Sequence, residues 1–170
     1  MSVSTVRDSR SEHNPSEPDA HNRYLATHVA LLASSFRRWT GRNLIEPDRS
    51  DESQARALYF APFAILSHDS RPEPILNYAN RTGLRLFELT WSELIVMPSR
   101  LTAQAPDQAE RARLLSQVAA QGFIDDYRGV RITKTGRRFL IERATVWNLV
   151  DDEGRFQGQA ATFKEWRFID

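Results

Sequence analysis

The chain contains no cysteine, and this absence removes several classes of function at once. Disulfide frameworks, zinc–thiolate sites, iron–sulfur clusters, cysteine nucleophiles and cysteinyl-flavin photochemistry all require a thiol or thiolate. Because disulfides belong to oxidising compartments, a chain without cysteine is suited to the cytoplasm, and we expect it there.

Long apolar runs and an excess of either charge are also absent. No stretch approaches the ~20 apolar residues of a transmembrane helix, and the polar first 20 residues contain no apolar signal core. The 23 lysine and arginine residues against 22 aspartate and glutamate residues leave a net charge of +1. That balance gives no electrostatic footprint for nucleic acid or an anionic membrane, so we expect neither partner.

Histidine is scarce, and its positions predict no metal site. His21 and His28 are seven residues apart, which on one helix is about 10 Å and too far to share an ion. The HExxH, P-loop, GxSxG and GxGxxG motifs are missing as well. The sequence predicts no catalytic residue, and an enzyme of unassigned chemistry is the least favoured function.

The 170 residues suffice for one compact domain with its own core. Residues 1–18 are rich in polar residues and predict a disordered leader. Residues 19–54 predict an N-terminal amphipathic helix followed by a polar linker, and residues 55–170 form the main domain.

An apolar stripe predicts the N-terminal helix. Asp19 or Asn22 can cap the helix, and Gly41 can end it. Such a stripe must be buried, either against a sheet of the same chain or against the same helix of a second copy. We expect a homodimer formed through this helix. The stripe consists of Tyr24, Leu25, Val29, Leu32 and Phe36.

The rest of the sequence predicts two short strands, several short helices and three long strands. The short strands fall at 61–68 and 75–78, and the helices lie between Asn80, which can cap the first of them, and Gln121. The long strands at 123–133, 137–150 and 155–168 are joined by turns that contain glycine. The order predicts an α+β fold with a five-stranded antiparallel sheet.

This order is the PAS arrangement, and local motifs narrow the resemblance to the MEKHLA domain family. Residues 63–69 (FAILSHD) and 74–80 (PILNYAN) resemble the start of that domain. The match continues through PSRL at 98–101, GFID at 122–125, ATVWNL at 144–149 and GQAATF at 158–163. It covers about residues 55–166, and the N-terminal helix is similar to the helix that precedes the domain in stand-alone bacterial members.

The resemblance implies a non-enzymatic sensory or regulatory domain. A PAS-like sheet carries short helices on one face and leaves a small pocket there, so a small organic ligand is expected, although the family supplies no ligand and the cofactor stays unknown. A haem-binding PAS domain needs an axial histidine between about residues 80 and 121, where this chain has none. Any output is expected to pass through an effector protein that the sequence does not identify. In plants the MEKHLA domain lies at the end of homeodomain-leucine-zipper regulators. This sequence shows neither a homeodomain nor zipper heptads, so that regulatory role is not transferred to it.

Five residues are candidates for ligand contacts: Asn77, Asn80, Arg143, Trp147 and His68. Strand alternation places Arg143 and Trp147 on one face. If that face lines the pocket, Arg143 could anchor an anion and Trp147 could stack on the ligand. In the alternative interpretation Trp147 belongs to the core, and Arg143 pairs with a carboxylate such as Asp125 or Glu165.

The other three candidates also have structural alternatives. Asn77 and Asn80 resemble positions at which PAS domains bond a ligand or brace a loop, and a helix cap would look the same in the sequence. His68 could be a pocket base or a turn residue at the end of a strand. The leading hypothesis is a ligand-binding sensory domain that self-associates, and the second is a pure interaction module with a filled core and no pocket.

Overall fold

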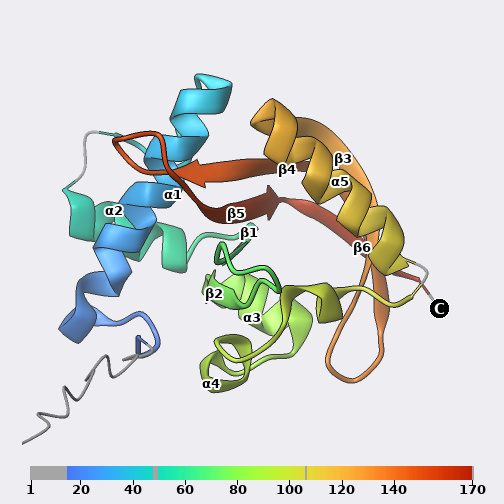
Figure 1. Ribbon diagram of the computed structural model, residues 1–170. Helices are drawn as coiled ribbons and strands as arrows, with labels where there is room; N and C mark the ends of the chain where they lie inside the picture. Colours follow the sequence, from blue (N-terminus) through green and yellow to red (C-terminus); the bar gives the residue numbers. More distant parts are fainter. Residues whose placement is uncertain (1–14, 48–49, 106, 170) are drawn as a thin grey trace, which may run out of the picture.

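The computed structural model describes residues 15–47, 50–105 and 107–169. Helical elements and strands follow in the predicted order (Figure 1). The helical elements are η1 (Ala20–Leu25), α1 (Ala26–Thr40), α2 (Asp51–Tyr59), α3 (Arg81–Phe87), α4 (Trp91–Leu94), η2 (Ser99–Thr102) and α5 (Asp107–Gln121). The strands are β1 (Ala64–His68), β2 (Leu76–Ala79), β3 (Phe123–Ile132), β4 (Arg138–Val150), β5 (Phe156–Phe163) and β6 (Glu165–Ile169).

The strands form one antiparallel sheet in the order β2-β1-β5-β4-β3. The predicted last strand is divided into β5 and β6, which pair with successive halves of β4. The division falls opposite Arg143 and Ala144 of the continuous strand β4, where Arg143 has a φ of 52°. The predicted α+β fold with an antiparallel sheet is therefore confirmed, with its last strand broken in two.

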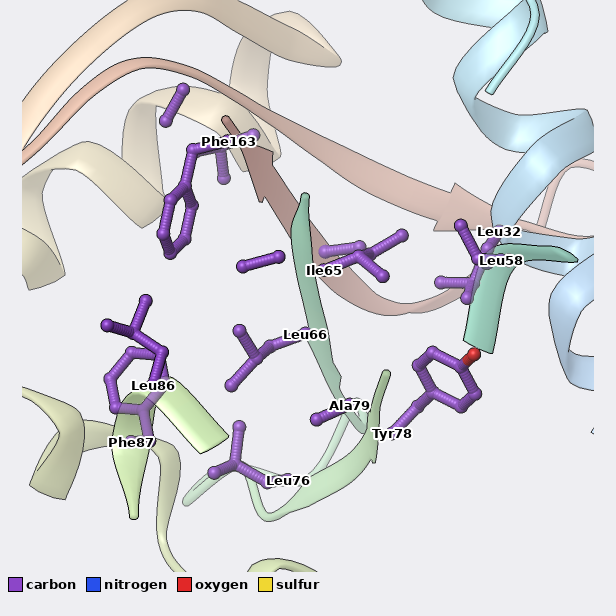
Figure 2. Close-up of a cluster of buried hydrophobic side chains, with 14 of the residues drawn as sticks. Leu32, Leu58, Ile65, Leu66, Leu76, Tyr78, Ala79, Leu86, Phe87 and Phe163 are labelled. Atoms are coloured by element: carbon purple, nitrogen blue, oxygen red, sulfur yellow. The ribbon is translucent and has the colours of Figure 1, made fainter. Parts of the chain in front are cut away.

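Helices cover both faces of this sheet, with α1 and α2 on one side and α3, α4 and α5 on the other (Figure 1). The side chains of β1 alternate between the two layers, as Figure 2 shows: Leu66 lies on the side of Phe87 and Phe163, and Ile65 lies on the side of Leu32 and Leu58. The core is thus split by the sheet into two apolar layers.

The N-terminal helix begins later than its first capping residue suggests. Asp19 and Asn22 form a capping box, but a 3-10 segment follows in which Arg23, Tyr24 and Leu25 have positive φ. The regular helix α1 begins at Ala26 and ends, as predicted, before Gly41 in the left-handed conformation.

The apolar stripe of α1 is buried against the sheet of its own chain. Leu32 is fully buried, and the ring of Phe36 lies 5.0 Å from that of Trp147 on β4. The Trp39 indole donates a hydrogen bond to the Asn148 carbonyl at 2.9 Å. Of the two ways to bury the stripe, packing against the sheet of the same chain is therefore the one observed. The homodimer remains a prediction, and the stripe of α1 no longer supports it.

Part of the predicted leader belongs to the fold. The Trp91 indole donates a hydrogen bond to the Pro15 carbonyl at 2.8 Å, and the Tyr59 hydroxyl donates one to the Glu17 carboxylate at 2.6 Å. Pro18 is buried. Residues 1–14 of the leader lie outside the described residues. The predicted linker is also shorter, because Ser50 caps α2 and the helix begins at Asp51.

Candidate functional site

A cavity of about 60 Å³ lies between the sheet and the helices α3, η2 and α5. Most of its wall is apolar, as in ligand pockets generally. The apolar side chains come from the sheet and from both ends of the helical layer: Leu66, Leu76, Phe87, Leu114, Leu115, Ile141, Val146, Ala161 and Phe163.

His68, at the end of β1, is one of the polar residues in this wall, and it is 5 % exposed. Its Nδ1 lies 2.8 Å from the Asp69 carbonyl oxygen. Because a carbonyl can only accept, Nδ1 carries the proton of the neutral ring and Nε2 offers a lone pair. Nε2 is buried and makes no hydrogen bond of good geometry within the described residues, although the Gln159 side chain lies near enough to oppose the lowering of the His68 pKa. Burial lowers the pKa of His68 below its usual 6.5, so the ring is neutral at pH 7.

Two arginine side chains border the same cavity. Arg131 on β3 is 8 % exposed and donates to the Val130 carbonyl at 2.8 Å and to the Tyr127 hydroxyl at 3.4 Å. Arg111 on α5 makes no hydrogen bond or ion pair with any residue in the described part of the chain. Burial and then the positive charge of Arg131 lower the pKa of Arg111 to about 10, which leaves Arg111 charged at pH 7.

No aspartate or glutamate is among the residues that line the cavity. The carboxylate connected to it is that of Glu110, which accepts a hydrogen bond from the Tyr127 hydroxyl at 2.9 Å. It therefore reaches Arg131 only through that phenol. The cavity thus combines an apolar wall, two guanidinium groups and an unused imidazole lone pair.

A surface groove of about 390 Å³ adjoins the cavity and shares Arg111, Leu115 and Gln159 with it. The groove runs between α5 and the turn at Pro72–Pro74. Gln159 is held in place, because its amide donates to the Leu115 carbonyl at 2.9 Å and to the Asn148 side chain at 3.1 Å. The three shared residues therefore form the boundary between the cavity and the surface groove.

Sequence alternation placed Arg143 and Trp147 on the wrong side for this cavity. Three steps along β4, from Ile141 to Ala144, face two steps along β3, which is a β-bulge. The bulge reverses the alternation, so that Ile141 and Val146 both line the cavity. Trp147 is fully buried against α1 and donates to the Leu32 carbonyl at 3.3 Å.

Arg143 is exposed at the bulge, and its guanidinium lies 3.6 Å from the Glu165 carboxylate. The alternative interpretation, with Trp147 in the core and Arg143 paired with Glu165, is therefore the one observed. Neither residue is among those that line the cavity.

Asn80 acts as a structural brace. Its Nδ2 donates to the carbonyls of Leu58 and Phe63, and its Oδ1 accepts from the amides of Ile65 and Gly83. These four hydrogen bonds use the whole bonding capacity of the amide. The residue also caps α3, as the sequence predicts.

Asn77 lies on the α1 side of the sheet, in a chain of hydrogen bonds. The Ser67 hydroxyl donates to the Asn77 side chain at 2.6 Å, and His28 Nε2 lies 2.9 Å from the same hydroxyl. Of the five predicted ligand residues, His68 alone is among the residues that line the cavity.

Sequence reasoning missed Arg111 and Arg131. One signal for Arg131 was present, because alternation along β3 places it on the same face as Tyr127 and Gly129. Nothing in the sequence around Arg111 distinguishes it from Arg113, which is exposed on the same helix. Within the described residues, no group of histidine and acidic side chains could hold a metal ion, and no helix is long and apolar enough to cross a membrane.

Comparison with known families supplies the identity of the domain. The model of the MEKHLA domain matches residues 26–168. The chain belongs to the MEKHLA domain family. The match begins with α1, so this helix is part of the MEKHLA domain as the family defines it.

The curated relatives of this MEKHLA domain include plant homeobox-leucine zipper proteins. Homeobox-leucine zipper protein ATHB-9 of Arabidopsis thaliana is 28% identical over 163 residues, and homeobox-leucine zipper protein HOX32 of Oryza sativa subsp. japonica is 26% identical over 159 residues. Each alignment covers 91% of this chain but only 18% of the relative. The similarity thus concerns one region of much longer proteins.

Solved structures similar to the MEKHLA domain are PAS and light-oxygen-voltage domains. The PAS domain of a protein from Colwellia psychrerythraea superposes with a TM-score of 0.58 at 18% identity, covering 69% of this chain and 95% of that one. An RNA-binding light-oxygen-voltage receptor gives a TM-score of 0.59 at 22% identity, covering 71% of this chain and 34% of the receptor. At these identities the similarity establishes the fold.

Proposed function

We propose that this MEKHLA domain is a non-enzymatic sensory or regulatory domain that binds a small organic ligand in the cavity and signals through an effector protein. The observation that carries the proposal is His68 Nε2, a buried lone pair in the cavity wall without a partner among the described residues. A buried polar atom left unsatisfied costs about 1–3 kcal/mol. A ligand that donates a hydrogen bond would remove that cost.

Arg111, a half-buried residue, supports the same proposal. It makes neither a hydrogen bond nor an ion pair within the described residues, although it borders the cavity. Long charged side chains usually place their charge in water or beside a partner. Its position at the boundary with the surface groove suits a residue that meets an entering ligand.

The cavity volume favours a second candidate function. About 60 Å³ is less than half the volume of an engineered cavity of about 150 Å³ that holds benzene. A domain whose core is nearly filled could act through its surface alone, as an interaction module without a ligand.

Filling the cavity distinguishes the two functions. Ala161 on β5 lines the cavity, and Ala161→Leu adds three carbon atoms there. We expect a compound screen monitored by thermal unfolding to find stabilisers of the wild type that no longer stabilise Ala161→Leu. Ala120→Leu, at an exposed position of α5, is the matched control and should respond like the wild type. If no compound stabilises the wild type, or if both variants respond equally, the interaction module is the better description.

A further inference from the structure

The polar groups of the cavity define the chemistry of a ligand more narrowly than its size does. Two donors, Arg111 and Arg131, carry positive charge, and one acceptor, His68 Nε2, is neutral and unused. A ligand that matches all three has a negatively charged acceptor group and one hydroxyl that donates.

The geometry of the guanidinium group favours a planar anion. Its N–H donors form a rigid fork that matches the two oxygens of a carboxylate, whereas a spherical ion presents a single acceptor atom to the fork. Arg131 is partly engaged, but with the neutral oxygens of Val130 and Tyr127. Its charge, like that of Arg111, is therefore not balanced by a carboxylate in the cavity wall.

The volume limits the ligand to a few atoms. A buried water needs about 10–15 Å³ of cavity volume measured in this way. A cavity of about 60 Å³ therefore holds about four to six water-sized atoms. A ligand that is one or two atoms longer would extend past Arg111 into the adjoining groove, which shares that residue.

Resting on the proposed ligand-binding function, we propose that the MEKHLA domain binds a small planar oxyanion of the carboxylate type that also carries a hydroxyl. The two oxygens of the anion lie between Arg111 and Arg131, and the hydroxyl donates to His68 Nε2. Bicarbonate and small hydroxy acids such as glycolate share this chemistry.

Titration calorimetry with four probes at constant ionic strength tests the assignment. Glycolate and bicarbonate carry both the anion and the hydroxyl, acetate lacks the hydroxyl, and glycolamide lacks the charge. We expect glycolate or bicarbonate to bind at least fivefold more tightly than acetate, and glycolamide to bind at least tenfold more weakly than glycolate. The order of glycolate and bicarbonate tells which of the two the cavity prefers.

Matched variants locate the binding. Arg111→Gln removes one charge at the edge of the cavity, and Arg113→Gln removes an equal charge from an exposed position of the same helix. We expect Arg111→Gln to weaken glycolate binding at least tenfold and Arg113→Gln to change it less than twofold. Arg131→Gln should also weaken glycolate binding at least tenfold. Arg131 is the more deeply buried of the two arginines, so if Arg131→Gln does not fold, the comparison of Arg111→Gln with Arg113→Gln decides the test.

The outcomes separate this inference from the proposed function. If glycolamide binds as tightly as glycolate, the ligand need not be an anion. The inference is then wrong, while the proposed ligand-binding function stands. Glycolate binding that Arg111→Gln and Arg113→Gln weaken equally would place the anion elsewhere on the surface and overturn the assignment. If none of the four probes binds, the assignment is wrong, and the Ala161→Leu comparison decides whether the domain binds another ligand.

Discussion

The half-buried imidazole of His28 makes the stability of the domain depend on pH in a calculable way. His28 lies on α1 with Nε2 2.9 Å from the Ser67 hydroxyl, and its ring centroid is 5.5 Å from that of Tyr78. Burial lowers the pKa of His28 from 6.5 to about 4. In the unfolded chain the same group titrates near 6.5. Between these values the unfolded state therefore binds more protons than the folded state.

The sign follows from this difference in proton binding. Stability rises with pH wherever the unfolded state binds more protons, so the contribution of His28 is lost as the pH falls below 6.5. For pKa values of 6.5 and about 4, the loss between pH 7 and pH 5 is about 2 kcal/mol. The pKa of His68 is lowered by burial too and acts in the same direction, but it is present in every variant compared.

Replacing His28 by glutamine isolates its contribution. The amide does not titrate, and it keeps an N–H that can donate to Ser67. We expect the free energy of unfolding in urea, followed by tryptophan fluorescence, to fall by about 2 kcal/mol less in His28→Gln than in the wild type between pH 7 and pH 5. His21→Gln is the control, because the His21 side chain is 97% exposed, and its pH dependence should equal that of the wild type. Equal losses in wild type and His28→Gln would refute the reasoning.

Three further substitutions test the fold, each by the free energy of unfolding in urea. Gly158→Ala should lower the free energy of unfolding by about 3 kcal/mol or more, because the new Cβ would lie 2.0 Å from the His68 carbonyl oxygen at a φ of +133°. Gly136→Ala is the control: its φ is also positive, but no atom lies within 4 Å of the new Cβ, and it should cost about 1 kcal/mol. Similar costs would contradict the close approach of β5 to β1. Asn80→Ala should cost about 3–5 kcal/mol, because it leaves the buried amides of Ile65 and Gly83 without a hydrogen-bond acceptor. A cost under about 1 kcal/mol would contradict the bracing role of Asn80. Arg143→Ala should change stability by less than about 0.5 kcal/mol, because its ion pair with Glu165 is exposed, and a loss above about 2 kcal/mol would show that the bulge needs this side chain.

Most of the fold could be predicted because its signals are local. Asn80 begins a helix wherever its side chain can accept from the amide three residues on, and this contact requires no knowledge of the sheet. The Thr90–Glu93 capping box and the left-handed Gly41 are local in the same sense. The order of such elements was enough to predict a PAS-like sheet.

The break between β5 and β6 was not predictable from local signals. Residues 155–168 contain no proline, and the conformation that interrupts pairing lies at Arg143 on the neighbouring strand. A non-glycine residue with positive φ is uncommon and carries no sequence signature. The single predicted strand therefore became two.

The same residue explains why the site was only partly predicted. Strand alternation has a period of two, so one extra residue exchanges the faces of everything beyond it. The bulge at Arg143 turns Val146 toward the cavity and Trp147 toward α1. The arginines that do border the cavity come from α5 and β3 and meet only in the folded chain. His68 was found because a histidine at the end of a predicted strand, next to Asp69, is visible in the sequence without knowledge of the sheet.

Neighbouring residues of a strand face opposite layers, so the sheet connects the cavity directly to the layer of α1. Val146 and Trp147 are neighbours in β4, yet one lines the cavity and the other packs against Phe36 and Leu32 of α1. In β1 the neighbours Ser67 and His68 are divided in a similar way, because the Ser67 hydroxyl meets His28 of α1 while the imidazole of His68 belongs to the cavity wall. A ligand in the cavity and the helix α1 therefore contact consecutive residues of the same two strands. Because close-packed interiors transmit strain, the ligand proposed above would act on the packing of α1 through these two strands.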